Sequence, residues 1–410
     1  MKKKNRAIVL FFLALAAINA KDIYIPQDYP DIQTAIDNAF PFDRIIIDGG
    51  KHRGPLLIGI PLTIEGKEGT RPVIYKETNN NTISPLIMTG ANIRVVLKNL
   101  TLSATAPETP LSSEAIGILA KDTNLSLENI DITGFYLYSL IQTGGSLSTT
   151  DTKLLTNPEW EIPIKGGFYL YGLSTINIDY MRSDLHEIST IIHIADKIPF
   201  KERLSLNTKP FITEPITGAT VKLQESQNTP VSIVRIYGSR LLVPDKRDAS
   251  AILITGKANI IMLDNYIYSI GDNRTKTSIS PSAAIRIQNQ AKLRIVKNRI
   301  TDTPRALRIE NTKSSVEISV EESSIINNNA GIEIINSPFV KLDLGGGELG
   351  SKGNNTLGNT YSDIKITGKL NNLPITAFNN TFKRKPVIII DDSKEEKIEN
   401  IIKTEEKPST

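Results

Sequence analysis

A unit of about 20 residues repeats along this chain, and residues 282–301, SAAIRIQNQAKLRIVKNRIT, show it most clearly. Within this unit, the alternating runs AIRI and KLRIV are joined by polar residues, and Asn298 precedes a third short run, RIT. The pattern predicts strand, turn, strand, turn and strand in a single unit.

Neighbouring units keep the same spacing. A small residue leads an asparagine by 14 positions in four of them: Ala284 and Asn298, Ala251 and Asn265, Ala115 and Asn129, Pro85 and Asn99. Repetition at this period predicts a solenoid. No apolar period of 3.6 residues persists beyond residues 31–39, which argues against helical repeats.

Strands of three to five residues are too short to be stable alone. If each unit stacks on the previous one at about 4.8 Å, every strand pairs with its equivalents above and below. Ile, Leu and Val then stack inside. Asparagine suits the corners, because its amide can bond to the backbone and to the asparagine of the next unit, and because it tolerates left-handed backbone. The corners are not identical, since the apolar residue that follows the asparagine varies in position. We predict an all-β, single-stranded parallel β-helix.

The N-terminus has the pattern of an export signal. Lys2, Lys3, Lys4 and Arg6 precede an apolar run over residues 7–18, and Ala20 supplies a small residue for cleavage. The run is shorter than the ~20 residues of a membrane span. We therefore expect a signal peptide over residues 1–20, and a periplasmic, extracellular or cell-surface location.

Removal of residues 1–20 leaves 44 basic and 44 acidic residues, because the segment holds four of the 48 basic ones and none of the acids. The basic excess therefore belongs to the export signal and gives no reason to expect nucleic acid as a partner. The chain has no cysteine, which excludes disulfides and thiolate metal sites.

We expect one β-helix domain over residues 21–390. A short helix around residues 31–39, with Asp31 as N-cap, would cover the open end within a cap over 21–66. Rungs over about 133–217 are irregular and carry long loops, where such folds usually place function. Residues 391–410 hold seven acids and four bases and are expected to be a solvated, disordered tail.

Both ends of the chain resemble known proteins. Residues 23–66, with IPQDYPDIQTAIDNAF, GKHRG and PLTIEG, resemble the N-terminal opening of the pectin lyase-like superfamily, in which a helix caps the first rung. The segments KLDLGGGELGSKGNN and AFNNTF resemble the end of uncharacterised secreted bacterial β-helix proteins. The resemblance implies a right-handed parallel β-helix with PbH1-type repeats and does not specify an activity.

The catalytic motifs of this superfamily are missing. The chain lacks the aspartate and LGRPW-like segments of pectin methylesterases, the NTD, GHG and RIK-like motifs of polygalacturonases, and the DPH motif of epimerases. Sites like those of pectate lyases are not excluded, because they use scattered acids for calcium and a single Arg or Lys as base. Ca²⁺ is therefore expected only if the protein is a lyase, and no other cofactor or metal is expected.

One stretch of the sequence brings together side chains of the types that act as acids, bases or sugar-binding groups. Alternation would place Arg182, Asp184 and His186 on one outward face, between the two long loops, as an acid/base or sugar-binding group. The alternative is a solvated turn with local ion pairs. These three residues are the weak catalytic candidates of the sequence.

Aromatic residues gather in the preceding loop and rung. Trp160, Tyr169 and Tyr171 could stack on sugar rings along a groove beside the sheet. The alternative, which we favour for Trp160, is that it anchors its own loop. Three scattered histidines make no zinc spacing.

Three functions remain open at this level. The first is a non-catalytic exported protein that binds polysaccharide or cell-surface glycans. The second is a polysaccharide lyase or hydrolase with a dispersed site. The third is a structural or adhesive surface protein.

Overall fold

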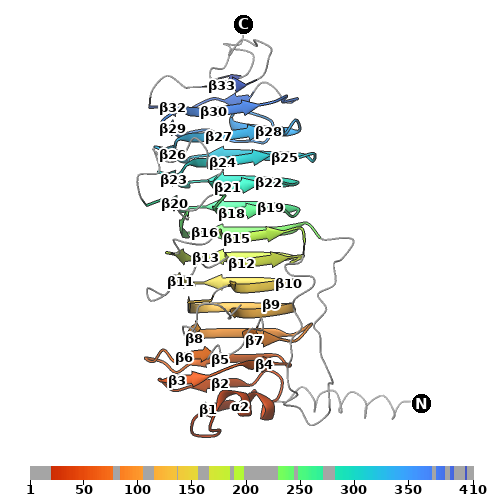
Figure 1. The fold of residues 1–410 in the computed structure, drawn as a ribbon, viewed down its shortest axis with the longest axis vertical. Coiled ribbons are helices and arrows are strands. Elements are labelled where there is room, and N and C mark those ends of the chain that lie inside the picture. The colour runs from red at the N-terminus through yellow and green to blue at the C-terminus, as the bar shows by residue number, and fades with distance from the viewer. Residues whose placement is uncertain are drawn as a thin grey trace, which may run out of the picture.

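The computed structural model describes residues 20–76, 84–104, 115–135, 137–155, 166–184, 189–197, 230–243, 248–270, 282–371, 375–383, 388–391 and 402–403. Within them the chain forms one helix and 34 strands, and the strands pair in parallel. The strands rise as one stack from the N-terminal to the C-terminal end (Figure 1).

The pairings define three ladders that run the length of the stack, which we call sheets 1, 2 and 3. Sheet 1 contains β4 (Leu56–Ile58), β7 (Ser84–Thr89), the first parts of β9 (Ala115–Thr133) and β10 (Tyr138–Thr150), β12 (Gly166–Tyr171), β15 (Thr190–Ala195), β18 (Ser250–Ile254), β21 (Ala283–Ile287), β24 (Arg305–Glu310), β27 (Ala330–Ile335), β30 (Ser362–Thr367) and β33 (Ile388–Asp391).

Sheet 2 contains β1 (Asp22–Ile25), β2 (Arg44–Ile47), β5 (Leu62–Gly66), the first part of β8 (Arg94–Ala104), the middle of β9, the end of β10, β13 (Thr175–Asp179), β16 (Ser232–Tyr237), β19 (Ala258–Leu263), β22 (Ala291–Val296), β25 (Val316–Glu321), β28 (Val340–Gly345), β31 (Ile375–Ala377) and β34 (Ile402–Lys403).

Sheet 3 contains β3 (Lys51–Arg53), β6 (Val73–Lys76), the ends of β8 and β9, β11 (Lys153–Leu155), β14 (Arg182–Ser183), β17 (Arg240–Leu242), β20 (Tyr266–Tyr268), β23 (Arg299–Thr301), β26 (Ser324–Ile326), β29 (Thr356–Gly358) and β32 (Thr381–Phe382). Each turn of the chain therefore adds one strand to each sheet, which is the geometry of the predicted parallel β-helix.

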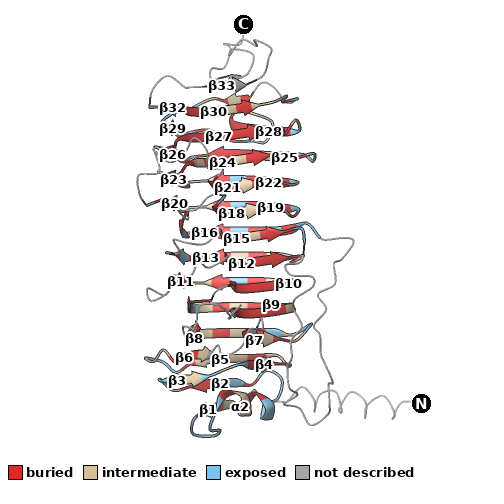
Figure 2. Ribbon diagram, viewed as in Figure 1, coloured by how far each residue is buried: buried red, intermediate tan, exposed pale blue. Residues whose placement is uncertain are grey.

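The unit at residues 282–301 folds as predicted, into β21, β22 and β23. Its apolar residues at alternate positions, among them Ile285, Leu293 and Ile300, are at most 2% exposed and belong to one continuous core. Figure 2 shows that buried residues recur in the strands along the whole stack. Like side chains stack on like, because parallel pairing in register repeats the same inward positions in every rung.

The predicted capping helix is present as α2 (Ile32–Asn38), at the N-terminal end of the stack (Figure 1). Asp31 caps it, since its carboxylate accepts a hydrogen bond from Thr34 N at 2.8 Å. Ile32 and Ile36 are buried against the first rungs. The helix thus covers apolar side chains that the first rung would otherwise expose.

The asparagine corners are of two kinds, which explains why the spacing after the asparagine varies. At Asn99 and Asn129 the asparagine itself is left-handed, with φ of 53° in both. At Asn265 and Asn298 the preceding residue is left-handed and the asparagine is buried, 1% exposed in both cases. Only the second kind brings the amide into the interior, where it bonds to the rungs on either side.

Most of the long connections follow a strand of sheet 3 in the sequence. Those over residues 105–114, 156–165, 185–188, 244–247 and 271–281 all join a sheet 3 strand to the next sheet 1 strand, whereas residues 198–229 join sheet 1 to sheet 2. All of these segments lie outside the described residues, as do residues 1–19 of the expected signal peptide and most of the expected tail. Among the described residues, no helix has the length and apolar character needed to cross a membrane.

Candidate functional site

The outer face of sheet 1 carries a column of side chains that changes character along the stack. Register pairs Tyr169 with His193 and His193 with Leu253, after which the column continues through Arg286, Arg308, Glu333 and Lys365. The first members are aromatic or apolar and the later ones are charged. Neighbouring rungs are about 4.8 Å apart, so successive members of the column are close neighbours.

The aromatic part is closely packed. Tyr169 meets Tyr138 and His193 edge to face, with ring centroids 5.2 and 4.7 Å apart, and its hydroxyl donates to Lys197 O at 2.8 Å. Burial lowers the pKa of His193 to about 4 and raises the pKa of Tyr138 to about 12. All three rings are therefore neutral at physiological pH.

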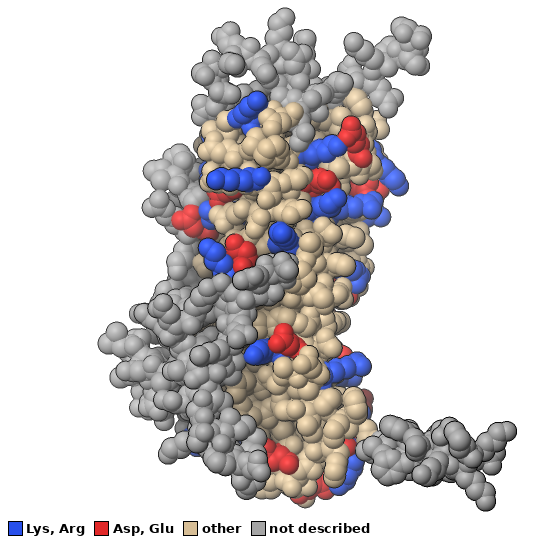
Figure 3. All heavy atoms as spheres, turned by 90° about the vertical axis from the view of Figure 1, so that its right-hand side faces the viewer, with Lys and Arg blue, Asp and Glu red and all other residues tan. Residues whose placement is uncertain are grey.

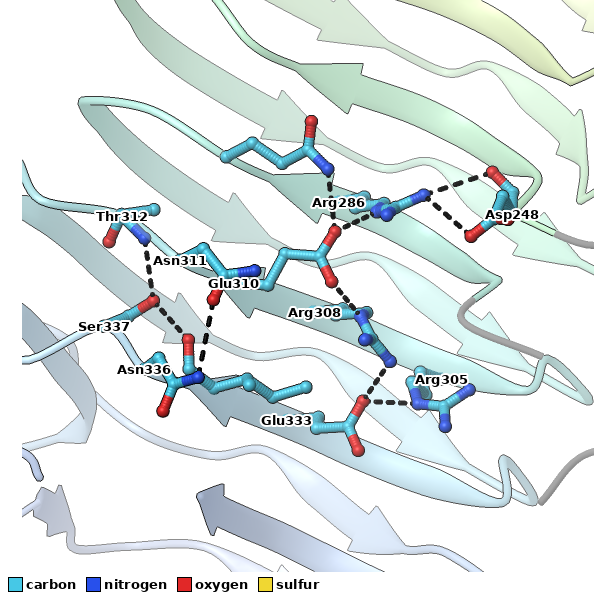
Figure 4. Close-up of polar contacts among 12 residues, drawn as sticks. Asp248, Arg286, Arg305, Arg308, Glu310, Asn311, Thr312, Glu333, Asn336 and Ser337 are labelled. Carbon is cyan, nitrogen blue, oxygen red and sulfur yellow. Dashed lines mark hydrogen bonds and ion pairs between the residues drawn. The ribbon is translucent and has the colours of Figure 1, made fainter. Parts of the chain in front are cut away.

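The charged part is an outer cluster of Arg286, Gln288, Arg305, Arg308, Glu310 and Glu333, drawn in Figure 4. Glu310 Oε1 accepts from Gln288 Nε2 at 2.7 Å and from Arg286 Nε, and Glu310 Oε2 accepts from Arg308 Nε at 2.6 Å. Arg286 also contacts the Asp248 carboxylate at 3.6 Å. Glu310 is thus surrounded by donors from three directions.

Glu333 is held in the same way one rung further on. Its Oε2 accepts from Arg308 NH1 at 2.7 Å and contacts Arg305 Nε, while Lys365 Nζ lies 3.8 Å from its Oε1. Arg308 therefore bridges both glutamates, as Figure 4 shows. Side-chain exposure is 6% for Glu310, 4% for Glu333 and 13% for each of the three arginines.

Burial and pairing oppose each other in this cluster. Burial acts to raise the pKa of Glu310, but the hydrogen bonds from Gln288 and Arg308 and the charge of Arg286 outweigh it, so the pKa lies below its ordinary value. Burial also lowers the pKa of Arg305, against the attraction of Glu333. A buried ion network adds little stability compared with apolar residues of similar size. A contribution to stability is therefore not enough to explain the outer cluster.

This arrangement suits recognition better than acid catalysis. A general acid needs a carboxyl whose pKa is raised towards the working pH, whereas Glu310 is held ionised by its donors. Planar amide, carboxylate and guanidinium groups offer donors and acceptors at fixed angles. Such groups match the hydroxyls of a sugar.

The residues singled out in the sequence are divided between two sheets. Tyr169 and Tyr171 lie on β12 in sheet 1 and are only 8% and 4% exposed. Arg182 and Asp184, at the end of the same rung, are exposed on the outer face of sheet 3. The structure therefore places the two groups on different faces. Trp160 and His186 lie outside the described residues.

No group of three or more His, Asp or Glu residues in the described part of the chain is arranged to hold a metal ion. His52 Nε2 lies 3.2 Å from the backbone oxygen of Asp48. His193 Nε2 lies 3.0 Å from Thr255 Oγ1. Both histidines thus have ordinary protein partners.

Sequence reasoning missed the outer cluster. It treated the regular rungs as scaffold and looked for function where the pattern breaks. A signal was available, because Arg286, Arg308 and Glu333 each stand between two inward apolar residues in three successive rungs. A charge repeated at one outward position predicts a charged column once the rungs are aligned.

Comparison with known proteins supports the fold. A family model described as "Protein of unknown function (DUF1565)" matches residues 206–389. PfbA, a surface adhesin of Streptococcus pneumoniae, superposes with a TM-score of 0.54 at 13% identity, covering 88% of this chain and 91% of that one. The polygalacturonase from Erwinia carotovora ssp. carotovora gives 0.50 at 10% identity, covering 91% and 96%. A search of curated proteins gave no match.

These similarities show that the chain has the right-handed parallel β-helix fold of pectin lyase-like proteins, as the sequence resemblance implied. At 10–13% identity they show the fold alone.

Proposed function

We propose that this protein is an exported, non-catalytic β-helix protein that binds glycans along the outer face of sheet 1. The observation that carries the proposal is the outer cluster, in which Glu310 and Glu333 are both bridged by Arg308 on an outward face. The N-terminal charge and apolar pattern supports export. The fold shared with a surface adhesin and a polygalacturonase is consistent with a carbohydrate-related role.

Glycan binding fits the chemistry of the face. Gln288 is exposed beside the largely buried arginines, and the aromatic part of the column lies on the preceding rungs. Preformed hydrogen bonds hold the polar groups in place, so that little side-chain entropy is lost when a ligand binds. An extended glycan chain could lie along the stack and meet one set of groups per rung.

Retention of the exported chain in gels that contain neutral or acidic polysaccharides tests this proposal. We expect retention by at least one polysaccharide, with no new reducing ends and no unsaturated products. Gln288→Ala should weaken binding about tenfold, equivalent to about 1.4 kcal/mol. Gln290→Ala is the control, because Gln290 is exposed at the next turn and its side chain makes no hydrogen bond to the described residues. Equal weakening by both variants, or no retention at all, would contradict the proposal.

A second candidate, a polysaccharide lyase, is favoured by one observation. Burial lowers the pKa of Arg305 although Glu333 pairs with it, so its guanidinium gives up a proton more readily than an ordinary one and is more available as a base. Unsaturated products that appear with wild type and disappear with Arg305→Lys would establish the lyase and exclude the non-catalytic role.

A further inference from the structure

A second surface lies on the outer face of sheet 3, away from the outer cluster. Register aligns five residues in successive rungs: Lys153, Arg182, Arg240, Tyr266 and Arg299. We call this set the basic column. Four rung spacings give it a length of about 19 Å. The strands that carry its upper part, β20 and β23, lie along the left edge in Figure 1.

Most positive charges of the basic column have no ion-pair partner among the described residues. Arg182, Arg240 and Arg299 are exposed, and no carboxylate of the described residues lies within ion-pair distance of them. Lys153 Nζ is 3.9 Å from Asp131 Oδ1, but that oxygen is already 2.9 Å from Arg71. The column thus presents several cations in a row to solvent.

Tyrosine rings hold two of these cations in place. Arg240 lies over Tyr266 and Tyr268, with Cζ 5.6 and 5.1 Å from the ring centroids. Arg299, from the rung on the other side, lies 5.6 Å from the Tyr266 centroid. Tyr266 and Tyr268 are stacked at 4.8 Å. A guanidinium that stacks on an aromatic ring still has its N–H groups available to bind an anion.

On sheet 2, by contrast, charged residues of opposite sign pair with each other. On its outer face Lys292 is 3.0 Å from Glu317, and Arg294 is 2.6 Å from Glu321. Figure 3 shows positive and negative side chains interspersed on the side that it presents. Like charges directly opposite each other on paired strands are destabilising. The stacking of Lys153, Arg182 and Arg240 therefore opposes folding, which indicates a use other than stability.

We propose that the basic column binds an anionic polysaccharide that lies along the stack and presents a carboxylate or sulfate group to successive rungs. Arginine forks match both anions with paired hydrogen bonds. Nucleic acid fits less well. The Tyr266 ring lies between two guanidinium groups and is not free to stack on bases, and the chain beyond residue 20 has no net basic charge.

The test measures binding of the exported chain to heparin, hyaluronan, dextran and single-stranded DNA. We expect binding to heparin or hyaluronan that weakens steeply between about 0.05 and 0.5 M salt, and no binding to dextran at this surface. Heparin and hyaluronan distinguish sulfate from carboxylate as the preferred anion. DNA bound more tightly than both polysaccharides would overturn the proposal.

A charge-matched pair of variants locates the site. Arg182→Gln, Arg240→Gln and Arg299→Gln combined should weaken binding at least tenfold without loss of folding. Lys292→Gln, Arg294→Gln and Lys341→Gln combined remove the same charge from sheet 2 and should change binding less than threefold. Equal losses would mean that net charge alone attracts the polymer, which would overturn the proposal. The triple variant on sheet 3 should leave unchanged any retention by neutral polysaccharides, which carry no anion for the basic column, so the two surfaces are tested separately.

Discussion

The side-chain oxygen of Asn298 accepts hydrogen bonds from both nitrogens of Asn265 on the preceding rung, from the backbone N at 3.0 Å and from Nδ2 at 2.8 Å. Asn298 Nδ2 in turn donates to the carbonyls of Met262 and Val296, each at 2.8 Å. Its backbone N donates to Ser323 Oγ on the following rung, at 3.1 Å. One buried residue thus joins three successive rungs at the corner between sheets 2 and 3.

Removal of this amide should therefore destabilise the fold. Asn298→Ala removes the acceptor of Asn265 N and one of the two acceptors of Asn265 Nδ2. It also removes the side-chain donor to the Met262 and Val296 carbonyls, and we expect the free energy of unfolding to fall by about 2–4 kcal/mol. Urea unfolding followed by circular dichroism measures the loss. Asn259→Ala, on the exposed face of β19, is the control and should change stability by less than about 0.5 kcal/mol. Similar losses in both variants would contradict the role given to the corner.

Phe42 should be a site where substitution stabilises the protein. It is 66% exposed and has a left-handed backbone with φ of 75°, a conformation that asparagine adopts more readily than phenylalanine. Phe42→Asn keeps the N–H that donates to Pro61 O and should raise the free energy of unfolding by about 0.5–1 kcal/mol. Phe40→Asn, at equal exposure but without positive φ, should give no gain. A loss of stability in Phe42→Asn would contradict this account.

His193 should make the protein sensitive to acid. Its pKa is about 4 in the folded state because of burial, against about 6.5 in an unfolded chain. Between these values the unfolded state binds a proton that the folded state does not, so stability falls as pH falls from about 6.5 to 4. His193→Gln should reduce this fall by about 2 kcal/mol in urea unfolding at a series of pH values. An unchanged pH dependence would show that the ring is not held neutral.

Replacement of Arg308 should destabilise the outer cluster. Arg308→Met leaves the nearly buried Glu310 and Glu333 with fewer donors, and we expect a loss of about 2–4 kcal/mol near neutral pH. Because the native pKa of Glu310 is lowered, its stabilising contribution is present above about pH 4.5 and is lost as pH falls through the folded pKa.

The penalty of Arg308→Met should therefore shrink in acid, where Glu310 becomes protonated. Arg294→Met provides the comparison, since Arg294 is 56% exposed although it also pairs with a buried glutamate, and its loss should cost about 1 kcal/mol or less. A penalty for Arg308→Met that does not depend on pH would argue against the assigned ion pairs.

The fold could be predicted from the sequence because each rung repeats local rules. Alternation at Ile285 and Ile287 gives the inward face, and the asparagines give the corners. Asp31 and the apolar residues that follow it give the capping helix. Each of these signals spans only a few residues, so no knowledge of distant contacts was needed.

The sites depend on which rungs are neighbours, and this is harder to predict. Arg182 pairs with Arg240, which lies 58 residues later, because the long connection over residues 198–229 falls between their rungs. Alternation predicted that Arg182 and Asp184 share an outward face, and both are exposed. It could not predict that Tyr169 of the same rung lies on another sheet, because that depends on where the turns fall.

The central claim, that this β-helix binds glycans without transforming them, is tested most directly by calorimetric titration with the polysaccharide that it retains best, followed by measurement of the recovered chain length. We expect saturable binding with a defined stoichiometry and a chain length that does not change after prolonged incubation. Shortened or unsaturated chains, or no heat of binding to any polysaccharide, would contradict it.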